Sequence, residues 1–509
     1  MVPDEEADPI VICTGSLWVH GGIAGNDTPA VIFQNVVGHL AAKDADGEAG
    51  QFVYGSDAMW WGLRHGGDEC DRSKLQTRIE LSWPVARGKV VNWELVGAVW
   101  QRAAQQICPG TNPQSVLLSE PPVCTNRYRE DAIDTAFKCF PNAQRICFAN
   151  TALLSLLASG RNTGVVLECG DQVCHAVAFK DIHIVEKSVT RLALGGRDLS
   201  AYLNKMLARK HAWEENKENY NSQCARDCKH RLCFVKKRRS EEYDPKGIEK
   251  AYEHVRSGDD AFLAAEERWL CPEALFQPAD CGGGLGVHRL IEECIARCPT
   301  ELRRELLQNI VIAGGSTMFS NFPDRLSDEL QMIFPSSHEG LPYYDGKVIA
   351  SPERNLSVWI GGSIFASLRV CPWITRSEYE QKGSAVVHEV STGSPSGVTD
   401  VWNFCPARGA YDGLPDIVLT LQAIVAKSDC FDLTLTTLCG DVLPAIQLSS
   451  QQEQDVSLAE AAIAEHLRTE PSRLKLILPD GRLVADFSGA ALSVMIGEQQ
   501  SGPFDRNDQ

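Results

Sequence analysis

Residues 309–319, Asn-Ile-Val-Ile-Ala-Gly-Gly-Ser-Thr-Met-Phe, contain the pattern on which the fold assignment depends. An apolar run ends at Gly314 and Gly315, small and hydroxylic residues follow, and residues 321–330 have the pattern of a helix. A buried strand that breaks on two glycines and opens into a helix lets backbone N–H groups approach an anionic ligand closely. Because glycines at the end of a strand are more often plain turns, this pair alone indicates a nucleotide site only weakly.

A second segment, residues 352–368, makes the nucleotide interpretation stronger. Its sequence is Pro-Glu-Arg-Asn-Leu-Ser-Val-Trp-Ile-Gly-Gly-Ser-Ile-Phe-Ala-Ser-Leu. Together the two segments closely resemble the signature segments of actin and the actin-related proteins. The resemblance covers residues 9–390. It implies an actin-like two-lobed fold, in which duplicated α/β halves surround a cleft that binds ATP or ADP and Mg²⁺.

The order of strand-like and helix-like segments supports the same fold class. Apolar strand-like runs alternate with segments of helical periodicity, which predicts an α/β architecture with mixed or parallel sheets. Strand–turn–strand segments that suit phosphate binding recur at residues 10–25 and 164–179, as a duplicated fold requires. The same pair of loops occurs in sugar kinases and heat-shock chaperone ATPases, so a sugar-kinase-like phosphotransferase remains a weaker alternative. The helical segments are residues 93–107, 129–140, 198–208 and 287–297.

Charge and cysteine content narrow the classes of function. The 509-residue chain has a formal net charge of -18, which argues against a general nucleic-acid binder because such proteins are normally basic. Its 19 cysteines include no C-x-x-C pair, so we expect reduced thiols in a cytosolic protein rather than disulfides or a zinc site. The acidic start lacks the features of a signal peptide, and no run of about 18 apolar residues predicts a membrane span.

The last part of the chain has a different character. Residues 391–415 include the segment Ser-Thr-Gly-Ser-Pro-Ser-Gly and predict a Ser/Gly/Pro-rich linker. In residues 416–509, strand-like runs at 431–438 and 443–448 precede a helical pattern at 456–467, then a strand, a Pro-Asp-Gly turn and a further strand. This order resembles the ubiquitin-like β-grasp fold. We therefore expect a small α+β ubiquitin-like domain that serves as an interaction module.

The first phosphate loop, residues 14–27, matches the early loop of the actin family. The resemblance implies that Gly15 and Ser16 hold the terminal phosphates through backbone N–H groups and a hydroxyl, and a tight turn does expose several donors to an anion. Two residues depart from the family pattern. Cys13 replaces an aspartate that helps to organise the water shell of the metal, and His20 replaces a lysine by a weaker, pH-dependent cation.

The second phosphate loop, Leu-Glu-Cys-Gly-Asp-Gln-Val-Cys-His, matches the family pattern Asp-x-Gly-Asp-Gly-x-x-His. The resemblance implies that Gly170 and Asp171 bind phosphate and that Asp171 and His175 have catalytic roles near the attacking water. Glu168 takes the place of the first aspartate. Because Mg²⁺ prefers carboxylate and phosphate oxygens together with water, Glu168 and Asp171 are the candidate residues of the metal shell.

Several substitutions bear on hydrolysis, which needs an in-line water near the terminal phosphate. Actins position this water with a glutamine. The resemblance places Thr151 there, and threonine is too short for the same task, although neighbouring Asn150 is an alternative position for this role. Gln172 replaces a glycine of the second loop, and its Cβ is expected to crowd the phosphates. With Cys13 and His20 also altered, we expect slow or absent ATPase activity of the actin type.

The adenosine side of the site keeps more of the family pattern. Residues 225–235 resemble the helix that packs against the base and the ribose, with Arg226 and Lys229 retained at its contact positions. His230 replaces a glutamate that binds the ribose, and Asn355 replaces a lysine beside the adenine. We expect nucleotide binding with altered affinity. The resemblance assigns the opposite wall to Gly314, Gly315, Ser316 and Phe319.

These features together predict a divergent actin-related protein. Its expected work is that of a nucleotide-binding cytoskeletal filament or assembly subunit in the cytoplasm. Its expected partners are other actin or actin-related subunits and actin-binding or complex-partner proteins, without direct nucleic-acid binding. The alternative is a non-hydrolysing actin-fold scaffold in a heteromeric complex, such as a chromatin-remodelling assembly in the nucleus. Residues 236–260, which start with Lys-Lys-Arg-Arg, are either a solvated surface or a nuclear-import patch.

Overall fold

The computed structural model divides the chain into two compact units. The first holds residues 1–278 and 285–401, and the second holds residues 279–284 and 402–509. The predicted linker at residues 391–415, the predicted helix at 456–467 and most of the charged stretch at 236–260 lie outside the described residues. The described residues are 8–41, 52–55, 78–211, 218–237, 250–252, 262–278, 284–335, 344, 347–368, 371–389, 417–426, 430–437, 446–449 and 474–477.

A six-stranded sheet forms the centre of what we call the first lobe. Its strands lie in the order β19-β10-β9-β1-β2-β3. β1 pairs with β2 antiparallel and with β9 in parallel, and β10 lies parallel to β9. The carboxyl ends of β1, β9 and β10 therefore meet at one edge of the sheet, where the turn after β1 also lies. The strands are β1 (Ile10–Thr14), β2 (Trp18–Ile23), β3 (Val31–Gln34), β9 (Ser115–Glu120), β10 (Arg145–Asn150) and β19 (Ile374–Thr375).

A second sheet, the centre of the second lobe, repeats this plan. β11 pairs with β12 antiparallel and with β17 in parallel, β18 lies parallel to β17, and β13 and β14 both pair with β12. The predicted α/β class is confirmed, and the hairpins β1–β2 and β11–β12 correspond to the two predicted strand–turn–strand segments. The strands are β11 (Gly164–Cys169), β12 (Cys174–Lys180), β13 (His183–Ile184), β14 (Thr190–Leu192), β17 (Ile310–Ala313) and β18 (Val348–Ile349).

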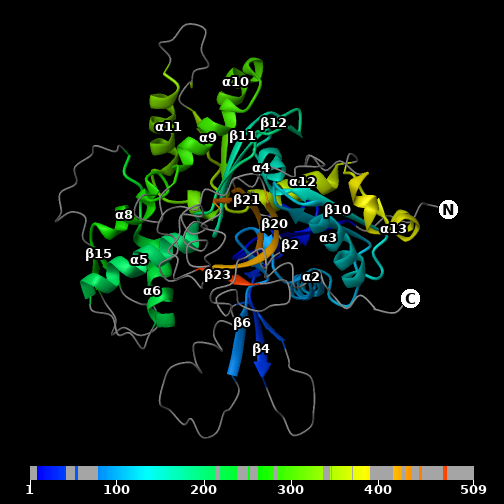
Figure 1. The fold of residues 1–509 in the computed structure, drawn as a ribbon. Helices are drawn as coiled ribbons and strands as arrows, with labels where there is room; N and C mark the ends of the chain where they lie inside the picture. Colours follow the sequence, from blue (N-terminus) through cyan, green and yellow to red (C-terminus); the bar gives the residue numbers. More distant parts are fainter. Residues whose placement is uncertain are drawn as a thin grey trace, which may run out of the picture. The chain divides into compact units, whose positions relative to one another are not determined.

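Helices α2 (Trp93–Ile107) and α3 (Asn126–Cys139) pack on one face of the first sheet (Figure 1). In α2 the buried residues recur three and four positions apart and so form one apolar stripe. The side chain of Asn92 caps the start of this helix by accepting a hydrogen bond from the backbone N–H of Leu95. The bounds of α2 match the sequence prediction. α3 begins before the predicted Arg129, because Thr125 accepts from the backbone N–H of Tyr128 and caps the helix there.

The other face of the first sheet is covered by α12 (Ser357–Ser367), which lies against α4 (Thr151–Ala158) (Figure 1). The two helices pack backbone to backbone. A Cβ built on Gly361 would collide with the carbonyl group of Leu154, and one built on Gly362 would lie 2.8 Å from Val11 Cγ1. The Gly-Gly pair of the second signature segment therefore serves helix packing.

The remaining elements of the first unit flank these two sheets. Helices α5, α6 and α8 pack on one another beside the second lobe, and α9, α10 and α11 lie along its sheet (Figure 1). A three-stranded sheet, β5-β4-β6, and the small hairpin β7–β8 follow the first three strands. Their bounds are β4 (Val37–Ala41), β5 (Phe52–Tyr54), β6 (Arg78–Ser82), β7 (Val85–Ala86), β8 (Lys89–Val90), α5 (Gly196–His211), α6 (Glu218–Leu232), β15 (Lys250–Tyr252), β16 (Phe262–Ala264), α8 (Glu267–Glu273), α9 (Val287–Ala296), α10 (Thr300–Leu307), η3 (Gly315–Thr317), α11 (Phe322–Ile333), α13 (Arg376–Lys382) and η4 (Gly383–His388).

The second unit contains four described strands in the order β22-β21-β20-β23. β20 (Ile417–Ala426) and β21 (Cys430–Thr437) form an antiparallel hairpin, β22 (Ile446–Ser449) pairs with β21, and β23 (Leu474–Ile477) lies parallel to β20. The predicted hairpin at residues 431–448 corresponds to β21 and β22. β20 was not predicted from the sequence, although its run of apolar and β-branched residues is typical of a strand.

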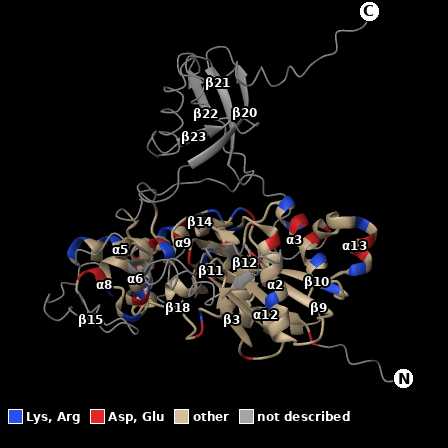
Figure 2. Cartoon of the chain, turned by 90° about the horizontal axis from the view of Figure 1, so that it is seen from below, with Lys and Arg blue, Asp and Glu red and all other residues tan. Residues whose placement is uncertain are grey.

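Charged residues of both signs lie along the surface helices of the first unit. Lys and Arg residues alternate with Asp and Glu residues over α3, α5, α8 and α13 (Figure 2). Among the helices that the structure describes, none combines the length and the apolar character needed to cross a membrane.

Candidate nucleotide site

A cavity with a volume of about 350 Å³ is lined by residues from both lobes. Its walls come from the turn after β1, the turn after β11, helix α6 and the segment that follows β17. The structure thus brings together every residue that the sequence analysis proposed for the nucleotide, for catalysis or for the metal shell. These residues are Gly15, Ser16, Glu168, Gly170, Asp171, His175, Arg226, Lys229, Gly314, Gly315, Ser316 and Phe319.

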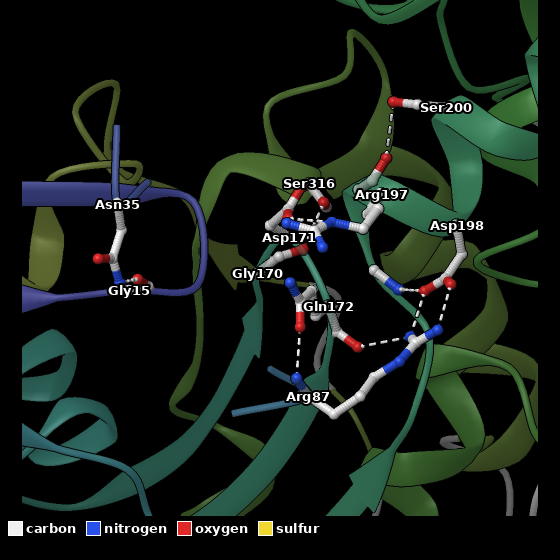
Figure 3. A network of polar contacts seen from close by, with 12 residues as sticks. Gly15, Asn35, Arg87, Gly170, Asp171, Gln172, Arg197, Asp198, Ser200 and Ser316 are labelled. Carbon is white, nitrogen blue, oxygen red and sulfur yellow. Dashed lines mark hydrogen bonds and ion pairs between the residues drawn. The ribbon is translucent and has the colours of Figure 1, made fainter. Parts of the chain in front are cut away.

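The first loop is fixed by hydrogen bonds on both of its sides. The backbone N–H of Gly15 donates to the carbonyl of Trp18 at 2.9 Å, which closes the turn between β1 and β2. The side-chain amide of Asn35 donates to the carbonyl of Gly15 at 2.8 Å (Figure 3). The indole Nε1 of Trp100 donates to Thr14 Oγ1 at 2.9 Å. These contacts leave Ser16 at the cavity wall, in a turn whose backbone position is set by neighbouring elements.

The second loop is tied to two other elements through the carbonyl of Gly170. It accepts hydrogen bonds from Ser316 Oγ at 2.8 Å and from the backbone N–H of Gly196 at 3.0 Å (Figure 3). The N–H of Gly170 itself donates to the carbonyl of Val173 and closes the turn. The loop is therefore held between the start of α5 and the segment after β17, so a ligand that displaces it would also displace these two elements.

Gly314 is required by the close approach of two backbones. Its φ is 91°, a conformation that residues with a side chain rarely adopt. A Cβ at this position would collide with the carbonyl group of Cys169 at the end of β11. Gly315, by contrast, has nothing within 4 Å of a built Cβ. Of the two signature glycines, the first therefore serves strand packing, and the second leaves open space at the cavity wall.

Gln172 does not occupy the position that the sequence analysis gave it. It was expected to crowd the phosphates, but it is absent from the cavity lining and is 2% exposed. Its side-chain oxygen accepts a hydrogen bond from the backbone N–H of Arg87 (Figure 3). The side chain has therefore turned toward the β7–β8 hairpin.

The Thr151 hydroxyl donates to Glu168 Oε2 at 2.8 Å, so these two altered residues contact each other. Burial raises the pKa of Glu168 to about 7, against a smaller lowering by the Thr151 hydrogen bond. Burial likewise raises the pKa of Cys13 to about 12, so this residue supplies a neutral thiol where the family has a carboxylate. Asn150 caps α4 by accepting from the N–H groups of Ala152 and Leu153, and it does not line the cavity.

Two histidines at the cavity are neutral at physiological pH. Burial lowers the pKa of His20 to about 4. Burial, with a smaller contribution from the Arg191 charge, lowers the pKa of His175 to about 3. His20 therefore does not supply the positive charge of the lysine that it replaces, and His175 can offer a neutral imidazole to a ligand or a water.

Arg197, which was not predicted from the sequence, forms an ion pair with Asp171. Arg197 Nε lies 3.3 Å from Asp171 Oδ2 (Figure 3). Arg197 follows Gly195 and Gly196, and a glycine pair that opens a helix is the signal by which this position could have been found.

A two-lobed α/β fold whose repeated hairpin turns face one cavity defines an actin-like nucleotide-binding protein. The family model for actin matches residues 4–391 of the chain. Because this match covers most of the 509 residues, the chain belongs to the actin family.

Proposed function

We propose that this protein is an actin-related assembly subunit of the cytoskeleton that binds ATP or ADP and hydrolyses ATP slowly or not at all. The observation that carries the proposal is the convergence of all the predicted nucleotide residues on one cavity. Two glycine turns, the α6 cations and the segment after β17 surround it, as a phosphate-and-adenosine site requires.

Slow hydrolysis is supported by the contact between Thr151 and Glu168. The attacking water must be held in line with the terminal phosphate. Thr151 is short and its hydroxyl is already donated to Glu168, and Asn150 is used to cap α4. In this proposal His175 is the remaining group that can orient a water, and Asp171 acts beside it at the second loop.

A titration followed by a turnover measurement tests this proposal. Purified full-length protein, stripped of nucleotide, is titrated with ATP in Mg²⁺ by calorimetry, and phosphate release is then followed on the same sample. We expect micromolar or tighter binding and slow release. Rapid release would refute the proposed role of Thr151, and no binding at millimolar ATP would refute the nucleotide site.

The second candidate is a non-hydrolysing scaffold subunit, and one set of contacts favours it. Arg87, from the β7–β8 hairpin, bonds to Asp198 of α5 and to Gln172 of the second loop. Direct contacts of this kind between protein groups suit a subunit with a structural role. Sedimentation separates the candidates, because filaments would support the assembly subunit, whereas a monomer that enters a heteromeric complex would support the scaffold.

We further propose that residues 416–509 form a ubiquitin-like module for partner binding, joined to the actin-like domain by residues 391–415. The parallel pairing of β23 with β20, the first strand of the hairpin, supports this assignment. Expression of residues 416–509 alone, followed by amide NMR, tests it, because a dispersed spectrum is expected of a folded domain.

A further inference from the structure

Around Asp171 of the second phosphate loop, positive charge exceeds negative charge. Arg197 pairs with Asp171. Arg226 and Lys229 lie within electrostatic reach of the same carboxylate, because Asp171 raises the pKa of both cations against the larger, opposite effect of burial. Arg226 and Lys229 line the cavity, whereas Arg197 is not among its described lining residues. Because Arg197 offsets the charge of Asp171, the other two cations leave a net charge of about +2 at this end of the cavity.

These cations have hydrogen-bonding capacity left for a ligand. Arg226 lines the cavity, and within the described part of the chain it makes no hydrogen bond or ion pair. Lys229 is only 5% exposed, and its ammonium group donates to the carbonyl of Gly196. A Cβ built on Gly196 would lie 3.2 Å from Lys229 Nζ and 3.5 Å from Asp171 Oδ1. The cationic groups therefore converge where the second loop meets α5.

The carboxylates of the cavity, in contrast, are already engaged. Glu120 accepts two hydrogen bonds from Arg129, at 2.6 and 3.0 Å. Asp171 is paired with Arg197, and Glu168 accepts from Thr151. Among the described residues that line the cavity, these three are the only Asp and Glu side chains. Each of the three therefore already faces a protein donor, although Asp171 Oδ2, 3.3 Å from Arg197 Nε, makes no hydrogen bond.

This donor set does not fit Mg²⁺, which the actin family generally binds with its nucleotide. A hard, small cation prefers carboxylate and phosphate oxygens, and a thiol is a poor substitute. Cys13 offers such a thiol, 3% exposed, where the resemblance places a carboxylate. Among the described residues, no group of three or more His, Cys, Asp or Glu side chains is placed to hold a metal ion.

We propose that this site binds its nucleoside di- or triphosphate without a divalent cation, and that Arg226 and Lys229 neutralise the phosphate charge instead. The inference rests on the proposed nucleotide site and specifies the ionic form of its ligand. The free nucleotide carries about two more negative charges than its Mg²⁺ complex, which matches the charge surplus around Asp171.

Calorimetric titration of the stripped full-length protein with ATP, once in EDTA and once in Mg²⁺, tests the proposal. We expect the dissociation constant in EDTA to be equal to that in Mg²⁺ within about threefold, or lower. A loss of affinity of about tenfold or more in EDTA would overturn it. Absence of binding in both buffers would instead refute the nucleotide site itself, so the two failures are distinguishable.

Three variants extend this test. Arg226→Gln removes one cation from the cavity and should weaken binding in EDTA more than binding in Mg²⁺. Arg127→Gln, on the exposed surface of α3, is the matched control and should change neither. Cys13→Asp supplies a carboxylate and should make binding depend on Mg²⁺. An equal loss for Arg226→Gln in both buffers would contradict the proposed charge compensation.

Discussion

Arg87 and Asp198 lie face to face, with Arg87 Nη1 and Nη2 each 2.7 Å from one oxygen of the Asp198 carboxylate. Arg87 Nη1 also lies 3.1 Å from the carbonyl oxygen of Gln172. One guanidinium therefore joins the β7–β8 hairpin to α5 and to the second phosphate loop (Figure 3). Two parallel hydrogen bonds between a guanidinium and a carboxylate are stronger and more directional than a single ion pair.

Replacing Arg87 by Ala should lower the free energy of unfolding by about 2–3 kcal/mol. The reason is that Asp198, 15% exposed, would keep its charge without the paired donors. Urea denaturation measures the effect. Arg289→Ala is the control, because the Arg289–Glu292 pair on α9 is exposed at 46% and 39% and should contribute less than about 1 kcal/mol. Equal losses in the two variants would contradict the importance of the Arg87–Asp198 contact.

Gly314→Ala and Gly315→Ala should differ sharply, although they are neighbours. At Gly314 the positive φ and the collision with Cys169 should together destabilise the fold by about 3 kcal/mol or more. At Gly315 a built Cβ has no atom within 4 Å, so the free energy of unfolding should change by less than about 1 kcal/mol. Thermal unfolding of the two variants tests this difference, and we expect the lower melting temperature for Gly314→Ala. Similar melting temperatures would contradict the close packing at Gly314.

Thr151→Gln should raise the single-turnover rate of phosphate release in Mg²⁺ by about tenfold, because the longer side chain can reach and orient a water. Thr151→Ser is the matched control, since it keeps the hydroxyl that bonds to Glu168 without adding reach. Its rate should equal that of the unmodified protein. If the glutamine variant is no faster, the limit on hydrolysis lies elsewhere in the site.

His20→Gln should make stability less dependent on pH between about 4 and 6.5. Because burial lowers the pKa of His20 to about 4, the unfolded chain binds a proton in this window that the folded chain does not. Stability is therefore lost as pH falls through the window, by about 3 kcal/mol for this residue.

The variant must be compared with the unmodified protein because Glu168 has the opposite effect on the pH dependence of stability. Burial raises the pKa of Glu168 to about 7, so its contribution to stability falls as pH rises. Urea denaturation at several pH values measures the difference, with exposed His183→Gln as control. Parallel pH profiles for His20→Gln and the unmodified protein would show that His20 is not protected from protonation.

The sequence allowed the fold to be predicted where local pattern and backbone geometry coincide. The apolar run before Gly314 is β17, and the periodic segment 93–107 is α2. Such elements are specified by the spacing of apolar residues and by caps within a few positions. The members of the candidate site were assigned through the resemblance to actin, and the structure gathers them at one cavity.

The contacts among the site residues could not be predicted in the same way. Gln172 turns toward Arg87, 85 positions away, and Thr151 meets Glu168 across two different elements. The positions of these side chains depend on how distant segments pack together. The pattern of residues within one segment does not contain this information. The ion pair of Arg197 with Asp171 was missed for the same reason.

The order of the chain through the first lobe has a consequence for synthesis. Its first strands end at Asn150, whereas α12, which covers β1, starts at Ser357, and β19, which pairs with β10, starts at Ile374. A ribosome that adds about 5–20 residues per second needs roughly 10–45 s to make the intervening second lobe. During that time the nascent chain exposes an apolar sheet face and an unpaired strand edge, so the first lobe is the part of this protein that we expect to need chaperone protection.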